Sequence, residues 1–177
     1  MDVKTLYIFD FDNTLVTSDD EVSVLHKDNT KTILTTRTYL EYKKQDGDAF
    51  DYSNFVDSPL KNPVPTKLFN YFLEILKDSC KENTVVILTS RGFRFPVINF
   101  LEKYTNKLPG IICLGCNGPD AVVSKKIEWI KTYLRVMKSY FAVKYFDDHS
   151  ETCCAVLELS AEYRDKDFEI TLVKEKK

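Results

Sequence analysis

Short runs of apolar residues alternate along the chain with stretches in which apolar residues recur every three or four positions. The runs are rich in Val, Ile, Phe and Tyr, which is typical of buried strands. They cover residues 6–9, 84–89, 110–114, 141–146 and 168–173. The stretches with helical spacing cover residues 66–76, 96–104, 124–137 and 151–162. This alternation predicts an α/β fold, a doubly wound parallel (Rossmann-like) sheet with helices on both faces.

One long segment, residues 16–65, departs from this alternation. Two β-prone runs around a polar turn predict a β-hairpin over 22–35, and Thr35 or Thr36 is a candidate N-cap for a short helix after it. Residues 45–65 are rich in Pro, Asp and Asn, and we expect an irregular connection there. The segment is therefore expected to form a small flap inserted after the first strand. Such a flap is either a substrate-selecting lid or an ordinary surface elaboration.

The composition changes this picture little. With 44% hydrophobic and 29% charged residues, the chain has the profile of a soluble globular protein, and residues 1–177 fit a single domain. The net charge of −2 gives no global nucleic-acid footprint. No stretch approaches the ~20 apolar residues that span a bilayer, and we expect no signal peptide, because the first residues run directly into the first predicted strand. An odd number of cysteines, five, favours reduced thiols. We therefore expect an intracellular, cytoplasmic protein with no membrane contact and no obligate protein partner.

The first apolar run ends in two aspartates, Asp10 and Asp12. Because strand side chains alternate between faces, residues i and i+2 project to the same side. Two carboxylates held close together repel unless a metal or a proton relieves them. The pair therefore indicates either a Mg²⁺ site or a division of acid and base roles, and the alternative is a solvated turn with a capping role.

Other polar side chains follow other predicted strands. In a parallel sheet the carboxyl ends of the strands share one edge, so these residues are expected along one rim. The rim residues are Asp10, Asp12, Thr89, Arg91, Asp147 and Asp148. Carboxylates are hard ligands for Mg²⁺ and a guanidinium binds phosphate, so the set is suited to phosphoryl transfer.

These residues resemble the motifs of the haloacid dehalogenase (HAD) superfamily, and within it the magnesium-dependent phosphatases. Asp10-Phe-Asp12-Asn-Thr14 is similar to the first motif, Asp-x-Asp-x-Thr, and the strand ending in Thr89 is similar to the second. A lysine at the start of a helix, Lys125 or Lys126, matches the third motif, and Asp147-Asp148 matches the fourth. The four motifs occur in the right order over most of the chain.

The resemblance implies roles for the individual residues. Asp10 would be the nucleophile and Asp12 the general acid and then base. Mg²⁺ would be held by Asp10, Asp12 through its backbone carbonyl, and Asp148 with help from Asp147. Thr89 and the lysine would bind the transferred phosphoryl group, and Lys126 is favoured over Lys125 for that role. The further phosphate-binding candidates are Thr14, Ser90, Arg91 and Lys125.

A narrower resemblance concerns the substrate. Thr89-Ser90-Arg91 and Phe146-Asp147-Asp148 are similar to the phosphatase half of polynucleotide kinase-phosphatases, where an arginine in this position assists the phosphate. The Gly-x-x-x-x-Gly-Lys-Ser/Thr loop of a kinase half does not occur in the sequence. The resemblance and the small flap favour a nucleic-acid 3′-phosphate end. Nucleotides, sugar phosphates and phosphoproteins are the alternative substrates, and a catalytically silent binding protein with the HAD fold is the alternative function.

Two weaker signals remain. Cys113 and Cys116 have the spacing of a metal or redox pair, but the pair begins inside a predicted strand, which favours plain thiols. His149, beside the acidic pair, is either a group that orients a metal-binding carboxylate or an ordinary loop histidine.

Overall fold

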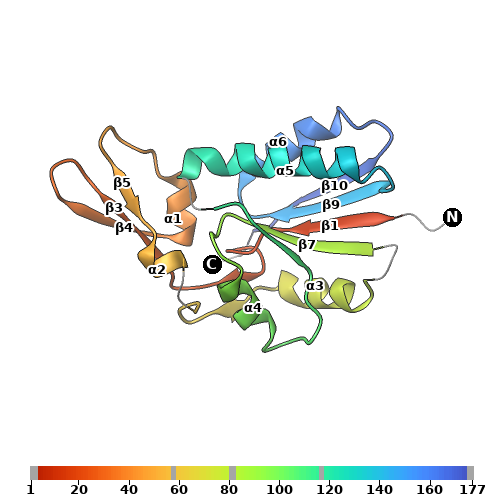
Figure 1. Cartoon of the computed structure of the whole chain (residues 1–177), viewed down its shortest axis with the longest axis horizontal. Helices are drawn as coiled ribbons and strands as arrows, with labels where there is room; N and C mark the ends of the chain where they lie inside the picture. Colours follow the sequence, from red (N-terminus) through yellow and green to blue (C-terminus); the bar gives the residue numbers. More distant parts are fainter. Residues whose placement is uncertain (1–3, 57–58, 80–82, 116–117, 175–177) are drawn as a thin grey trace.

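A five-stranded parallel sheet forms the centre of the molecule (Figure 1). The computed structural model describes residues 4–56, 59–79, 83–115 and 118–174. The strands lie in the order β10-β9-β1-β7-β8. Their bounds are Thr5–Phe9 for β1, Asn83–Thr89 for β7, Gly110–Cys113 for β8, Ala142–Asp147 for β9 and Asp167–Leu172 for β10. From β1 the chain builds outward through β7 and β8, and then returns to the other side of β1 for β9 and β10. The predicted parallel α/β sheet is confirmed at this level.

Helices cover both faces of the sheet (Figure 1). α3 (Leu68–Lys77) and α4 (Phe95–Leu101) pack on one face, and α5 (Val122–Val136) and α6 (Ser150–Ser160) pack on the other. β1 contributes side chains to the cores on both faces of the sheet, because successive side chains of a strand point to opposite faces. Tyr7 and Phe9 belong to the first core, whereas Leu6 and Ile8 belong to the second. All five residues of β1 are buried, so the end of this strand is held rigidly.

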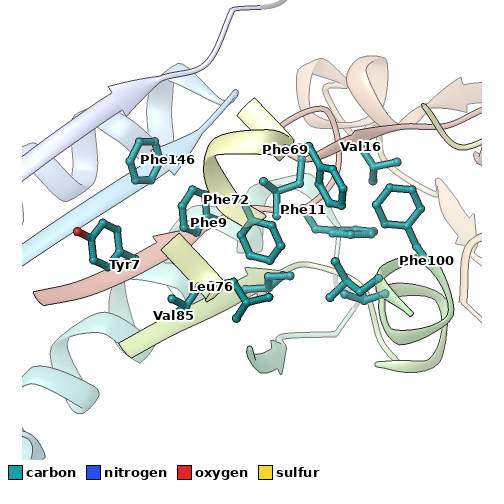
Figure 2. Close-up of a cluster of buried hydrophobic side chains, with 14 of the residues drawn as sticks. Tyr7, Phe9, Phe11, Val16, Phe69, Phe72, Leu76, Val85, Phe100 and Phe146 are labelled. Atoms are coloured by element: carbon teal, nitrogen blue, oxygen red, sulfur yellow. The ribbon is translucent and has the colours of Figure 1, made fainter. Parts of the chain in front are cut away.

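Aromatic rings fill much of the core under α3 and α4 (Figure 2). The ring of Phe9 stacks on that of Phe146 at 4.5 Å between centroids and meets Phe72 edge-on at 5.3 Å. Phe9 and Phe146 directly precede Asp10 and Asp147. This packing therefore fixes the two strand ends from which the acidic residues project.

The third long helix begins earlier than the sequence indicated. We expected Ser124 to start it, but α5 begins at Val122, after a 3₁₀ turn over Pro119–Ala121 (η1). Ser124 lies inside the helix, where its hydroxyl donates a hydrogen bond to the carbonyl of Ala121, and among the described residues no side chain caps the start of α5. The earlier start follows from Pro119, whose fixed φ favours the first turn of a helix.

The flap is a small layer of its own beyond the carboxyl edge of the sheet. The predicted hairpin is present as β3 (Glu21–Leu25) paired with β4 (Lys31–Thr35). Helix α1 (Thr36–Glu41) follows, and Thr35 caps it through a reciprocal bond with Thr38. Figure 1 shows this layer to one side of the main sheet.

The expectation of an irregular connection over 45–65 was wrong in part. β5 (Ala49–Asp51) adds a third strand beside β3, and α2 (Ser53–Val56) follows it. β6 (Val64–Pro65) then pairs with β2 (Val16–Thr17), so the two ends of the flap form a narrow neck. The polar residues that suggested a loop include Asp48, which binds three partners: the His26 ring at 2.7 Å, the Tyr42 hydroxyl at 2.7 Å and the Gln45 amide at 2.8 Å. These bonds, the one from Tyr42 above all, lower the pKa of Asp48 to about 2.

Candidate active site

Three carboxylates gather where β1 and β9 end side by side. Asp10 directly follows β1, and its amide donates to the carbonyl of Phe146 in β9 at 2.8 Å. Asp147 is the last residue of β9, and Asp148 follows it. Carboxylate oxygens of Asp10, Asp147 and Asp148 lie within 4.8 Å of one another. This point of the sheet, where the chain leaves in opposite directions, is the usual ligand site of doubly wound folds.

Lys126 enters this acidic cluster from the first turns of α5. Its ammonium donates to Asp10 Oδ1 and to Asp147 Oδ2, both at 2.7 Å, and its side chain is only 3% exposed. Lys125 points elsewhere and donates to the carbonyl of Leu114 at 3.2 Å. Of the two lysine candidates, Lys126 is thus the one that reaches the carboxylates. Burial alone would lower the pKa of Lys126, but the charges of Asp10 and Asp147 outweigh it and raise the pKa, so the ammonium stays charged.

Asp147 is held by two further donors that the sequence did not suggest. The Tyr145 hydroxyl donates to Asp147 Oδ2 at 2.5 Å, and the His149 amide donates to Oδ1 at 2.9 Å. Burial, and then the charge of Asp147, raise the pKa of Tyr145, which keeps it a hydrogen-bond donor. The available signal was strand periodicity, because residues 145 and 147 of one strand share a face. The His149 ring itself bonds the Thr152 hydroxyl at 2.8 Å.

The cluster carries more negative charge than one lysine neutralises. Burial raises the pKa of Asp10 well above its ordinary value, although Lys126 acts in the opposite direction. Burial and the neighbouring Asp147 raise the pKa of Asp148 to about 7. Oxygen donors with unrelieved negative charge fit a hard divalent cation such as Mg²⁺. The donor set of Asp10, Asp147 and Asp148 therefore suits the metal that the sequence suggested.

The loop after β1 is closed by its own backbone and by Thr14. Leu15 and Val16 donate to the carbonyl of Phe11, and Asn13 takes the left-handed conformation, with φ of 57°, that such a tight turn needs. The buried Thr14 hydroxyl donates to Asp148 Oδ1 at 3.4 Å. Thr14, a predicted phosphate-binding residue, thus contacts a carboxylate of the acidic cluster.

Asp12 is not one of the three clustered carboxylates and pairs with Arg91. Arg91 Nη2 donates to Asp12 Oδ1 at 2.6 Å, and Nε donates to Asp12 Oδ2 at 3.0 Å. Nη2 also donates to Asp20 Oδ2 at 2.6 Å. Arg91 is 1% exposed, so the predicted phosphate-binding role of its guanidinium does not fit its position: its donors are turned to carboxylates, not to an open site. The Asp12 side chain likewise lies on Arg91, which leaves its backbone carbonyl as its possible metal ligand.

The second predicted motif lies at the end of β7. Thr89 is fully buried, and its hydroxyl accepts a hydrogen bond from the Arg91 amide at 3.2 Å. Ser90, the next residue, is half-buried. The loop after β7 therefore turns back on Thr89, and this turn directs Arg91 inward.

A cavity of about 430 Å³ opens beside Asp148. The rim contributes Asp148 and His149 to its wall, the flap helix α1 contributes Arg37, and the chain after β10 contributes Lys174. The flap therefore forms part of the wall of the space next to the acidic cluster.

No protein-family model, curated protein or solved structure matches the chain. In the part of the chain that the structure describes, no helix is long and apolar enough to cross a membrane. Cys113, Cys153 and Cys154 are free thiols. Cys116, the second half of the predicted cysteine pair, lies outside the described residues.

The raised pKa of Asp148 predicts that this carboxylate destabilises the metal-free fold. Between pH 3.8 and about 7 the folded protein binds a proton that the unfolded chain has lost, so stability falls as the pH rises through this window. We expect Asp148→Asn, in EDTA and above pH 7, to raise the free energy of unfolding by roughly 1 to 4 kcal/mol. Urea unfolding followed at several pH values measures this gain, which should shrink towards pH 4.

The exposed flap residue Asp46 provides the control, because Asp46→Asn removes the same charge at a residue that is not part of the cluster. Equal stability of Asp148→Asn and the wild type at all pH values would contradict an unrelieved charge at position 148.

Proposed function

We propose that the protein is a Mg²⁺-dependent phosphomonoesterase of the HAD superfamily that acts through a phosphorylated Asp10. The observation that carries this proposal is the placement of Asp10, Asp147 and Asp148 around Lys126 at the carboxyl ends of β1 and β9. A nucleophilic carboxylate, oxygen ligands for a cation and a fixed ammonium are the parts that this chemistry needs.

Asp10 is oriented for attack by Lys126. Because Oδ1 accepts the ammonium hydrogen bond, Oδ2 is the oxygen left for the substrate phosphorus. The Oδ2–phosphorus bond forms while the bond from phosphorus to the leaving oxygen breaks, and the departing oxygen takes the electron pair of that bond. Lys126, fixed between two carboxylates, donates toward the charge that builds up on the phosphoryl oxygens.

Asp12 performs the proton transfers in both steps. In the first step its carboxyl group gives a proton to the leaving oxygen, which departs as an alcohol. In the second step the resulting carboxylate takes a proton from a water molecule. The water oxygen then attacks phosphorus, inorganic phosphate leaves, and the Asp10 carboxylate is restored.

Asp10, Asp147 and Asp148 would hold Mg²⁺, together with the carbonyl of Asp12. When bound, the metal neutralises charge on the phosphoryl oxygens and on the clustered carboxylates. The chain's own part is to hold these ligands, which it does through Tyr145, the His149 amide and Thr14.

The cavity beside Asp148 is the proposed place of the leaving group. Its wall carries two cations, Arg37 and Lys174, that can pair with further phosphates of a nucleic acid, and it also carries the acidic side chains of Glu41 and Glu151. Arg91 is buried on Asp12 and Asp20, so it is not the cation that would contact a nucleic acid. Arg37 and Lys174 are the candidates for that contact. A nucleic-acid 3′-phosphate end is therefore the narrower proposal, and mononucleotides, sugar phosphates and phosphoproteins are its alternatives.

Replacement of Asp10 tests the proposed chemistry. We expect Asp10→Asn to lower kcat on p-nitrophenyl phosphate with Mg²⁺ by at least about 10³-fold, because an amide oxygen is a poor nucleophile. The exposed Asp28 at the tip of the flap provides the control, and Asp28→Asn should keep wild-type turnover. Steady-state kinetics with and without Mg²⁺ measures both variants.

Full activity of a pure Asp10→Asn sample would contradict the nucleophile assignment. If the wild type shows no turnover on a broad panel of phosphate esters, and Mg²⁺ with beryllofluoride does not shift its melting temperature, a silent binding protein is the better description.

Replacement of Arg37 tests the substrate. We expect kcat/KM for a 3′-phosphorylated oligonucleotide to fall as salt rises, and Arg37→Gln to reduce that log–log slope by about 0.7, the loss of one contact to a single strand. Lys27→Gln is the control, because Lys27 is an exposed flap cation outside the cavity wall. A mononucleotide processed faster, without salt dependence, would contradict the nucleic-acid proposal.

A further inference from the structure

The guanidinium of Arg91 joins four segments of the chain. Arg91 itself belongs to the loop after β7. It donates to Asp12 in the loop after β1, to Asp20 in the flap next to its neck at 2.6 Å, and from Nη1 to the carbonyl of Phe55 in α2 at 3.2 Å. The guanidinium also lies over the ring of Phe55, 4.2 Å from its centroid. Two of these partners, Asp20 and Phe55, belong to the flap.

Because Arg91 and Asp20 are buried, the contact between them is costly to break. Arg91 is 1% exposed and Asp20 is 2% exposed, and charges buried to this degree need their partners. The guanidinium carries five N–H groups. The bonds to Asp12, Asp20 and Phe55 use that of Nε, both of Nη2 and one of Nη1. Four of the five N–H groups of Arg91 therefore bind the flap and the loop after β1.

The same bonds determine which oxygen of Asp12 is free to act. Oδ1 accepts from both Nη2, at 2.6 Å, and Nε, at 3.2 Å, whereas Oδ2 accepts only from Nε, at 3.0 Å. A carboxylate oxygen has two lone pairs, so Oδ2 keeps one for a proton while Oδ1 stays bound to Arg91. Asp12 is 13% exposed, which leaves it open to a substrate from which Arg91 is shielded.

We propose that Arg91 is a positioning residue. It makes the orientation of the Asp12 carboxylate depend on the flap, and Asp20 is the flap residue that holds Arg91 in place. This inference rests on the proposed function, in which Asp12 protonates the leaving group. The flap then acts on the chemistry itself as well as on access to the site. Without the hydrogen bond from Nη2 to Asp20, the guanidinium is no longer fixed on the flap side. Asp12 Oδ2 is then no longer held in the orientation that faces the leaving oxygen.

The test compares a poor leaving group with a good one. A misdirected general acid slows loss of phenol from phenyl phosphate, and it matters little for p-nitrophenyl phosphate, whose leaving group needs no proton. We expect Asp20→Asn to raise the ratio of kcat/KM for p-nitrophenyl phosphate over phenyl phosphate at least about tenfold, in the direction of Asp12→Asn, because general acids contribute about 10²- to 10⁴-fold. kcat/KM covers only the steps up to release of the leaving group, so the later role of Asp12 as a base does not enter.

The chain offers a matched control one residue away. Asp19 Oδ2 accepts from the Asn62 side chain at 2.8 Å, and Asp19→Asn makes the same chemical change in the same segment without touching Arg91. Its ratio should equal that of the wild type. In Asp20→Asn, Oδ1 can still accept the Lys61 amide hydrogen bond, at 2.9 Å in the wild type, so that anchor is kept. Arg91→Lys is the second variant, because a lysine cannot bridge Asp12 and Asp20 in the same forked geometry.

The outcomes separate this inference from the proposed function. Lack of turnover in the wild type would overturn both. If Asp12→Asn raises the ratio and folded Asp20→Asn and Arg91→Lys do not, the function stands and the link through Arg91 is wrong. An equal loss on both esters in these variants would also overturn it, because a purely structural role lowers both rates alike. Absence of a cooperative melting transition in both variants would assign Arg91 to holding the fold, and the proposal would again be wrong.

Discussion

The candidate site depends on the buried ammonium of Lys126 between Asp10 and Asp147. β1 and β9 are neighbours in the sheet, so the residues that end them are brought together whatever their charge. Their carboxylates repel in a buried environment, and the bonds of 2.7 Å from Lys126 to each of them offset that repulsion. Helix α5, which delivers the lysine, is therefore tied electrostatically to the strands on which it packs. The remaining negative charge raises the pKa of Asp148 and makes the three carboxylates a candidate site for a cation.

A second buried cation divides the rim into two parts. Lys126 holds Asp10 with the metal-binding candidates, whereas Arg91 holds Asp12 with Asp20. Two aspartates that are two positions apart in the sequence thus receive different cations and different surroundings. This separation suits a nucleophile and an acid–base group, because each needs its own proton affinity. It also connects Asp12, the proposed acid–base residue, to the flap, while Asp10, the proposed nucleophile, is connected to the sheet.

Much of the fold followed from the sequence because burial on both faces gives continuous apolar runs, which are hard to mistake. Strand ends therefore predicted which acids meet at the rim. The sequence could not distinguish Lys125 from Lys126, since both lie at the start of a helix and only the packing of α5 decides which one turns inward. Arg91 was misjudged because its partner Asp20 lies 71 positions away, in the flap, and no local pattern reports such a pairing. β5 was missed because a three-residue strand among polar residues carries too little periodicity.

The central claim is that the carboxylate of Asp10 carries the phosphoryl group during turnover. The most direct measurement is to quench the wild type in acid while it hydrolyses p-nitrophenyl phosphate with Mg²⁺, reduce the sample with borohydride, and analyse its peptides by mass spectrometry. Borohydride converts an aspartyl-phosphate to homoserine, and we expect this change at Asp10, only when substrate and Mg²⁺ are both present. Steady turnover with Asp10 unmodified, or with homoserine at another aspartate, would contradict the account.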